Sequence, residues 1–189
     1  MDTVLTREQG AALLKHARRV IAERLGIAEP ETGADEVLPD EEYAAFVTLK
    51  KNGLLRGCIG NLSAAGSVTE AVERNAVNAA FADPRFPALT AEEFEEVEID
   101  ISVLSTPQRL EYRDAQDLLE KLRPGIDGVT LSHHGASATF LPQVWEQLPD
   151  KEQFLNHLCQ KAGLDSTSWR DEHPEIEVYQ AQCFEEEKR

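Results

Sequence analysis

The sequence is poor in cysteine and lacks the common motifs of metal sites and of two enzyme classes. Its three cysteines (Cys58, Cys159 and Cys183) include no Cys-x-x-Cys pair, so reduced thiols in a reducing compartment are the simplest interpretation. Zinc-ligand spacing is missing, and His133 and His134 are expected to point to opposite faces of a strand. Neither Gly-x-Ser-x-Gly nor a P-loop is present, which argues against a standard hydrolase or NTPase. We therefore expect no metal and no cofactor.

Long apolar runs are also missing. No stretch approaches the ~18 apolar residues of a membrane span, and the first ten residues do not have the pattern of a secretory signal. We therefore expect a soluble, cytoplasmic protein without membrane contact. A chain of 189 residues is long enough to bury a sizeable core, and we expect a single domain that spans residues 1–189.

Basic residues are outnumbered by acidic ones. The 19 lysines and arginines stand against 35 aspartates and glutamates, which gives a net charge of −16. A field of that sign repels phosphate backbones at long range, so non-specific nucleic-acid binding is disfavoured. A nucleotide or an RNA at a locally basic cleft stays compatible with this charge. The acidic clusters in residues 29–42 and 92–100 are typical of a solvated surface.

The first third of the chain contains clear signals for a helix and a loop. Thr6 and Gln9 form a capping box ahead of apolar residues at helical spacing, which predicts a long helix over residues 6–25. Residues 27–42 contain proline, glycine and many acids, which predicts a loop.

A central hairpin is predicted for residues 43–61, where an Asn-Gly turn separates two apolar runs. A two-residue loop at this turn sets Leu49 opposite Arg56. Two residues further along, it sets Val47 opposite Cys58. Because opposed residues share a sheet face, we expect Arg56 and Cys58 on one face. Both faces are largely apolar, which predicts that the strand is covered on both sides.

The rest of the chain alternates between helical and strand patterns. Further helices are predicted over residues 67–81, 114–123, 142–148 and 150–163, and further strands over residues 97–105, 129–133, 138–141 and 176–184. Two pairs of strands form hairpins, so the sheet should be mainly antiparallel and flanked by helices. The predicted fold class is therefore α+β.

The second strand of the central hairpin contains the candidate nucleophile. Cys58 lies ~6–7 Å along the strand from Arg56, and a guanidinium at that range favours the thiolate. Gly57 and Gly60 allow a backbone or a ligand to approach closely. The alternative is that Cys58 is a small core residue and Arg56 a structural ion-pair partner, with the glycines easing packing. The sequence shows no obvious base near Cys58.

A second candidate follows the helix predicted over residues 67–81. Asp83 and Arg85 belong to an Asp-Pro-Arg-Phe turn, where Arg85 complements the dipole of the helix. One interpretation is a turn with an ion pair. The other is that Arg85 and Arg56 converge on a carboxylate or a phosphate through bidentate contacts.

Several long motifs together resemble the AMMECR family. They are LRGCIG after a Lys-Lys-Asn-Gly turn, then AAFADPRFPALT, VEIDISVLSTP and ATFLPQVWEQLPDKEQFLNHLCQKAGL. The match runs in order from about Phe46 to the C-terminus and is nearest to the stand-alone bacterial type of the AmmeMemoRadiSam system. The resemblance implies an α+β fold with two sub-lobes. It also implies co-occurrence with a Memo-type protein and a radical-SAM enzyme, and it leaves the reaction open.

The resemblance also implies a candidate site made of three segments. Its positions in this sequence are Arg56, Gly57, Cys58 and Gly60, then Asp83 and Arg85, then Phe140, Pro142 and Gln143.

Two functions stay open at this point. The first is an enzyme that acts on a small anionic molecule or a modified nucleotide or RNA, with Cys58 catalytic. The substrate would then be bound by Arg56, Gly57, Gly60, Asp83, Arg85 and Gln143. The second is a non-catalytic partner, or adaptor, of a Memo-type protein and a radical-SAM enzyme.

Overall fold

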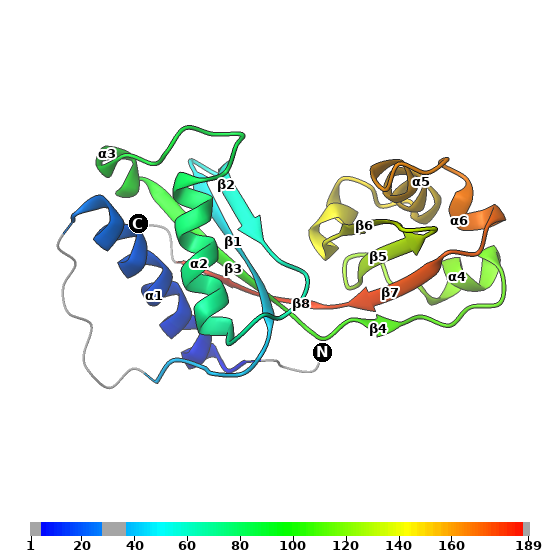
Figure 1. Cartoon of the computed structure of the whole chain (residues 1–189), viewed down its shortest axis with the longest axis horizontal. Coiled ribbons are helices and arrows are strands. Elements are labelled where there is room, and N and C mark those ends of the chain that lie inside the picture. The colour runs from blue at the N-terminus through cyan, green and yellow to red at the C-terminus, as the bar shows by residue number, and fades with distance from the viewer. Residues whose placement is uncertain (1–4, 28–36, 187–189) are drawn as a thin grey trace. The chain divides into compact units, whose positions relative to one another are not determined.

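The computed structural model describes residues 5–27 and 37–186, which divide into two compact units. Unit 1 comprises Met1–Ser105 with Gln182–Arg189, and unit 2 comprises Thr106–Ala181. Each unit is built on a four-stranded sheet and has its own apolar core (Figure 1). The predicted α+β class with antiparallel pairing is confirmed. Most of the predicted acidic loop lies outside the described residues.

The sheet of unit 1 has the strand order β2-β1-β3-β8. Its elements are α1 (Arg7–Leu25), β1 (Ala44–Lys51), β2 (Leu54–Gly60), α2 (Val68–Phe81), α3 (Ala91–Phe94), β3 (Val97–Leu104) and β8 (Ala181–Glu185). The helices α1 and α2 lie on one face of the sheet (Figure 1). Their apolar side chains pack with those of β1 and β3 in one core. The helices of unit 1 therefore cover one face, whereas covering on both faces was predicted for β2.

The capping box predicted for the first helix is confirmed. The side chain of Thr6 accepts a hydrogen bond from the backbone N–H of Gln9, and the Gln9 side chain accepts one from the backbone of Thr6. Gly26 ends α1 in the left-handed conformation, with φ of 73°, which glycine adopts without strain. Arg18 is buried on this helix, where it donates to the Val97 carbonyl at 2.7 Å. It thereby joins α1 to the start of β3.

The central hairpin is present, but its predicted register is wrong beyond the turn. Lys50 pairs with Leu55 as a two-residue loop requires, whereas Leu49 pairs with Gly57 and not with Arg56. Arg56 is the extra residue of a β-bulge, which shifts all later pairs by one position. The sequence pattern does not reveal such an insertion, because both alternate faces of β2 contain small or apolar residues.

The bulge moves Cys58 to the face opposite the one predicted. Cys58 lies opposite Thr48 and not opposite Val47. Val47 is fully buried in the core with the helices, whereas Thr48 and Cys58 are partly exposed. The expectation that Cys58 packs beside Val47 is therefore wrong. The prediction that Arg56 and Cys58 share a face of the sheet was based on the same register, so it is wrong for the same reason.

Unit 2 has the strand order β4-β7-β5-β6. Its elements are β4 (Gln108–Arg109), α4 (Ala115–Lys121), β5 (Gly128–His133), β6 (Ala136–Phe140), the 3-10 helix η1 (Pro142–Glu146), α5 (Lys151–Lys161), α6 (Ser168–Asp171) and β7 (Glu175–Tyr179). The ring of Trp145 stacks on that of Phe154 at 3.6 Å between centroids, in the middle of the core. Apolar residues of β5, β7 and α5 complete this core.

The last predicted strand, residues 176–184, is two strands. β7 pairs with β5 in the sheet of unit 2, whereas β8 lies beside β3 in the sheet of unit 1. The continuous apolar pattern does not show this division, because each strand alone alternates in the same way. The boundary of the two units falls within β8, after Ala181.

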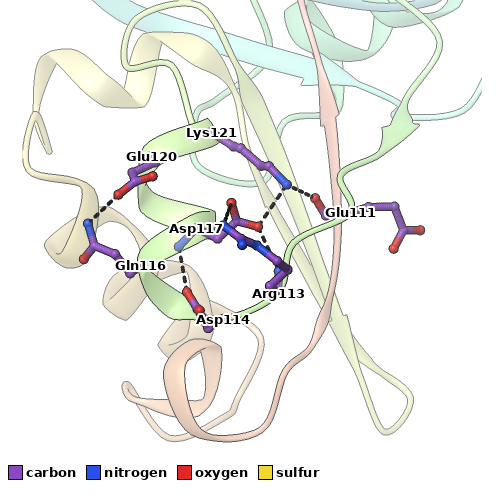
Figure 2. Close-up of polar contacts among 7 residues, drawn as sticks. All are labelled: Glu111, Arg113, Asp114, Gln116, Asp117, Glu120 and Lys121. Carbon is purple, nitrogen blue, oxygen red and sulfur yellow. Dashed lines mark hydrogen bonds and ion pairs between the residues drawn. The ribbon is translucent and has the colours of Figure 1, made fainter.

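A buried carboxylate organises the start of α4 (Figure 2). Asp114 caps the helix by accepting the backbone N–H of Asp117 at 2.9 Å. Asp117 accepts hydrogen bonds from the Lys121 ammonium and from the Arg113 backbone N–H, each at 2.9 Å. These bonds, that of Lys121 foremost, hold the pKa of Asp117 well below its ordinary value. Because Lys121 also donates to the Glu111 carbonyl, the network ties α4 to the chain before it.

Candidate functional site

Asp83 and Arg85 bond both backbone groups of Cys58. The Asp83 side chain is 1% exposed, and its Oδ2 accepts the Cys58 N–H at 2.9 Å. Arg85 binds the same carboxylate with two nitrogens, Nε to Oδ1 at 2.9 Å and Nη2 to Oδ2 at 2.7 Å. Nη2 also donates to the Cys58 carbonyl at 3.1 Å. The predicted turn with an ion pair is thus confirmed, and we call the two side chains the Asp83–Arg85 clamp.

The position of β2 explains why such a clamp is needed. β2 is an edge strand, so among the described residues no strand lies next to its outward-facing N–H and C=O groups. At Cys58 the Asp83–Arg85 clamp supplies one acceptor and one donor, as a paired strand would. The LRGCIG and Asp-Pro-Arg-Phe motifs therefore meet in one structural unit, although Cys58 and Asp83 are 25 positions apart.

The clamp residues are both charged at neutral pH. Hydrogen bonds from Arg85 hold the pKa of Asp83 far below its ordinary value of 3.8, with a further contribution from the Cys58 N–H and against the effect of burial. The pKa of Arg85 is raised, first by its hydrogen bond to Asp83 and in smaller part by Cys58.

Besides Asp83, the side chains of Thr48 and Arg85 are hydrogen-bonded to Cys58. The Sγ of Cys58 accepts a hydrogen bond from the Thr48 hydroxyl at 3.4 Å, and Nη2 of Arg85 donates to the Cys58 carbonyl at 3.1 Å. Among the cysteines, Cys159 is buried and Cys183 is exposed, whereas Cys58 is intermediate. The sequence pattern indicates Arg56 as the guanidinium near the thiol and does not reveal Thr48, because the predicted register places Val47 opposite Cys58.

Arg56 is bonded away from the thiol. Its Nε and Nη2 bind the two carboxylate oxygens of Glu93 at 3.1 and 2.9 Å, and Nη2 also donates to the Pro87 carbonyl at 3.0 Å. The hydrogen bond from Arg56 lowers the pKa of Glu93. The Arg56 side chain is 9% exposed, and its Nη1 is buried with no acceptor in the described part of the chain. These contacts fit the interpretation of Arg56 as a structural ion-pair partner.

The two glycines of β2 make close packing possible on opposite faces. A Cβ at Gly57 would overlap the carbonyl oxygen of Ala79, which is backbone of α2. A Cβ at Gly60 would instead overlap the ring of Phe46. Gly57 thus lets α2 approach β2, whereas Gly60 gives space to a side chain.

The remaining predicted site residues lie in unit 2. Gln143 is exposed in η1, Pro142 is buried at the start of that helix, and Phe140 ends β6. The structure therefore brings together the site residues of β2 and of the turn after α2, and it places Gln143 in the other unit.

The two neighbouring histidines do not point to opposite faces as predicted. The rings of His133 and His134 lie 3.9 Å apart, because His134 is in the turn after β5 with a positive φ of 49°.

Within residues 5–27 and 37–186, no group of three or more His, Cys, Asp or Glu side chains is placed to hold a metal ion. No helix in this part of the chain is long and apolar enough to cross a membrane.

The order and spacing of these motifs agree with a known family. The model of the AMMECR1 family matches residues 14–184. The chain belongs to the AMMECR1 family. A protein of Methanothermobacter thermautotrophicus is 36% identical to it over 187 residues, with 97% of each chain covered. A protein of Methanopyrus kandleri is 38% identical over 196 residues, which cover all of this chain and 93% of the relative.

The fold agrees with a solved AMMECR1-like structure. The crystal structure of an uncharacterised protein from Pyrococcus horikoshii matches with a TM-score of 0.85 and 34% sequence identity, over 97% of this chain and 94% of that chain. The relatives described here are archaeal proteins. The family is thus shown, and the stand-alone bacterial type stays a prediction.

The two glycines of β2 are expected to differ in their tolerance of a methyl group. Gly57→Ala should lower the free energy of unfolding by about 1–3 kcal/mol, because the new Cβ meets backbone that cannot move without shifting α2. Gly60→Ala should cost less, because the ring of Phe46 can rotate away. Calorimetric unfolding of both variants and the wild type measures the difference. Equal destabilisation by the two changes would contradict the close approach of α2 to β2.

Proposed function

We propose that this AMMECR1 protein is a cysteine-dependent enzyme that acts on a small anionic molecule or a modified nucleotide. Cys58 is the nucleophile or the acid/base group. One observation carries this proposal: Sγ of Cys58 accepts a hydrogen bond from Thr48, and the guanidinium of Arg85 donates to the carbonyl of the same cysteine. A hydroxyl donor and a fixed positive charge are the features that lower the energy of a thiolate.

Arg85 is the candidate contact for the anionic group. Its side chain is 53% exposed, and within the described residues no acceptor is bonded to its Nη1. The free edge of the guanidinium suits a carboxylate or a phosphate oxygen. We assign Asp83 and Arg56 a positioning role, because the hydrogen bonds of both charged groups go to partners within unit 1.

A second candidate function is favoured by exposed apolar residues on the central hairpin. Leu54 and Leu55, at the start of the edge strand β2, are 73% and 46% exposed. Adjacent exposed apolar side chains are typical of protein contact surfaces. We therefore also propose a role as a non-catalytic partner of a Memo-type protein and a radical-SAM enzyme, as the AmmeMemoRadiSam type implies.

Cysteine labelling tests the enzymatic proposal, with the other two cysteines as internal controls. Limiting iodoacetamide followed by mass spectrometry of the three cysteine peptides gives their relative rates. Cys58 should react about 10-fold faster than the more exposed Cys183, and Cys159 should stay unlabelled. Thr48→Val should slow the labelling of Cys58 and leave Cys183 unchanged. Faster labelling of Cys183 than of Cys58 in the wild type would sink the proposal.

Co-purification tests the partner role. The wild type should elute together with a Memo-type protein and a radical-SAM enzyme at micromolar concentrations, and a variant with Leu54→Ser and Leu55→Ser should elute alone. Val37→Ser is a matched control, because Val37 is also an exposed apolar residue but lies outside the hairpin. Separate elution of the three wild-type proteins contradicts the role, and so does unchanged co-elution of the double variant.

A further inference from the structure

An aromatic ring lies next to Cys58 on the face of the sheet that α1 and α2 leave uncovered. Phe46 pairs with Gly60, which is two residues along β2 from Cys58, so the three residues share a face. The space at Gly60 is taken by the ring itself, since a Cβ there would overlap it. The glycine is therefore what lets the ring of Phe46 lie over β2.

The ring of Phe46 is directed away from the apolar core of unit 1. Its neighbours Ala45 and Val47 are fully buried in that core, and side chains of successive residues in a strand point to opposite faces. Phe46 is intermediate in exposure, as are Thr48 and Cys58 on the same face. Phe46 is thus partly exposed on the face of the sheet that also holds the candidate nucleophile.

A positive charge lies at the edge of β2 beside Cys58. Nη2 of Arg85 donates to the Cys58 carbonyl, and Nη1 has no acceptor within the described residues. Alternate residues of a strand are about 7 Å apart, which is the spacing of the two backbone positions, Gly60 and Cys58, that the ring and the guanidinium contact. The ring, the thiol and the guanidinium therefore all lie at two alternate positions of β2, Gly60 and Cys58.

We propose that this face binds a planar ring that stacks on Phe46, joined by a spacer to a phosphate group that binds Arg85. The juxtaposition of Phe46 over Gly60 with Arg85 at Cys58 carries the proposal. A nucleoside monophosphate has this chemistry, because a ribose separates its planar base from its phosphate. The proposal rests on the function proposed above and adds the class of substrate to it.

Two nucleotides of equal charge isolate the contribution of the ring. Uridine 5′-monophosphate has a planar base, whereas 5,6-dihydrouridine 5′-monophosphate does not. Titrations followed by amide chemical shifts should show about 2- to 10-fold tighter binding of the planar nucleotide to the wild type, because stacking requires a flat ring. Uridine and ribose 5-phosphate should each bind more weakly than uridine 5′-monophosphate, since each lacks one of the two groups.

A variant then locates the contact. Phe46→Leu should abolish the preference for the planar nucleotide and keep the weaker binding of both, whereas Leu55→Ala, on the same strand, should leave the preference intact. Equal affinity of the two nucleotides for the wild type overturns the proposal without the need for any variant. Absence of a saturable shift at millimolar concentrations overturns it as well. If the preference is seen but Cys58 labels slowly, the binding site stands and the cysteine-dependent chemistry fails.

Discussion

The buried carboxylate of Asp83 at the edge of β2 is the constraint on which the candidate site depends. A charged carboxylate that is 1% exposed is costly unless it is paired and hydrogen-bonded. Three nitrogens of Arg85, its backbone N–H among them, and the backbone N–H of Cys58 satisfy that requirement. Because the N–H belongs to Cys58, satisfying the carboxylate also fixes the backbone that carries the thiol. Removing either charge would leave the other without its partner.

The clamp also closes the edge of the sheet. An exposed edge strand tends to pair with other chains, and proteins often blunt it with charged side chains. Asp83 and Arg85 occupy the backbone groups of Cys58, while the bulge at Arg56 interrupts the regular ladder beside them. The motif residues thus have structural tasks, and the groups still available for chemistry are the thiol, the Thr48 hydroxyl and the outer side of Arg85.

Much of the fold follows from local patterns in the sequence. The capping box at Thr6, the Asn-Gly hairpin and the alternation in β3 predict elements that the structure contains, because each depends on neighbours within a few positions. The division of residues 176–184 between two sheets was not predictable in this way. It depends on which distant strand pairs with each half, and the apolar pattern is the same for both.

The residues of the candidate site could be predicted from the sequence, whereas the contacts between them could not. The motifs pointed to Cys58, Asp83 and Arg85, which the structure brings together. They did not reveal that the bulge at Arg56 turns Cys58 toward Thr48, since one inserted residue reverses every later side chain. The sequence lacks a signal for the register between β1 and β2, because that register depends on how the two strands pair and not on residue type.

The exchange rate of the Cys58 amide proton tests the clamp most directly. This N–H points away from β1 and owes its protection to Asp83, so it should exchange slowly with deuterium in the wild type. Asp83→Ala should speed this exchange, and Thr48→Val, which leaves the carboxylate in place, should not. Rapid exchange in the wild type, or equal protection in Asp83→Ala, would contradict the account.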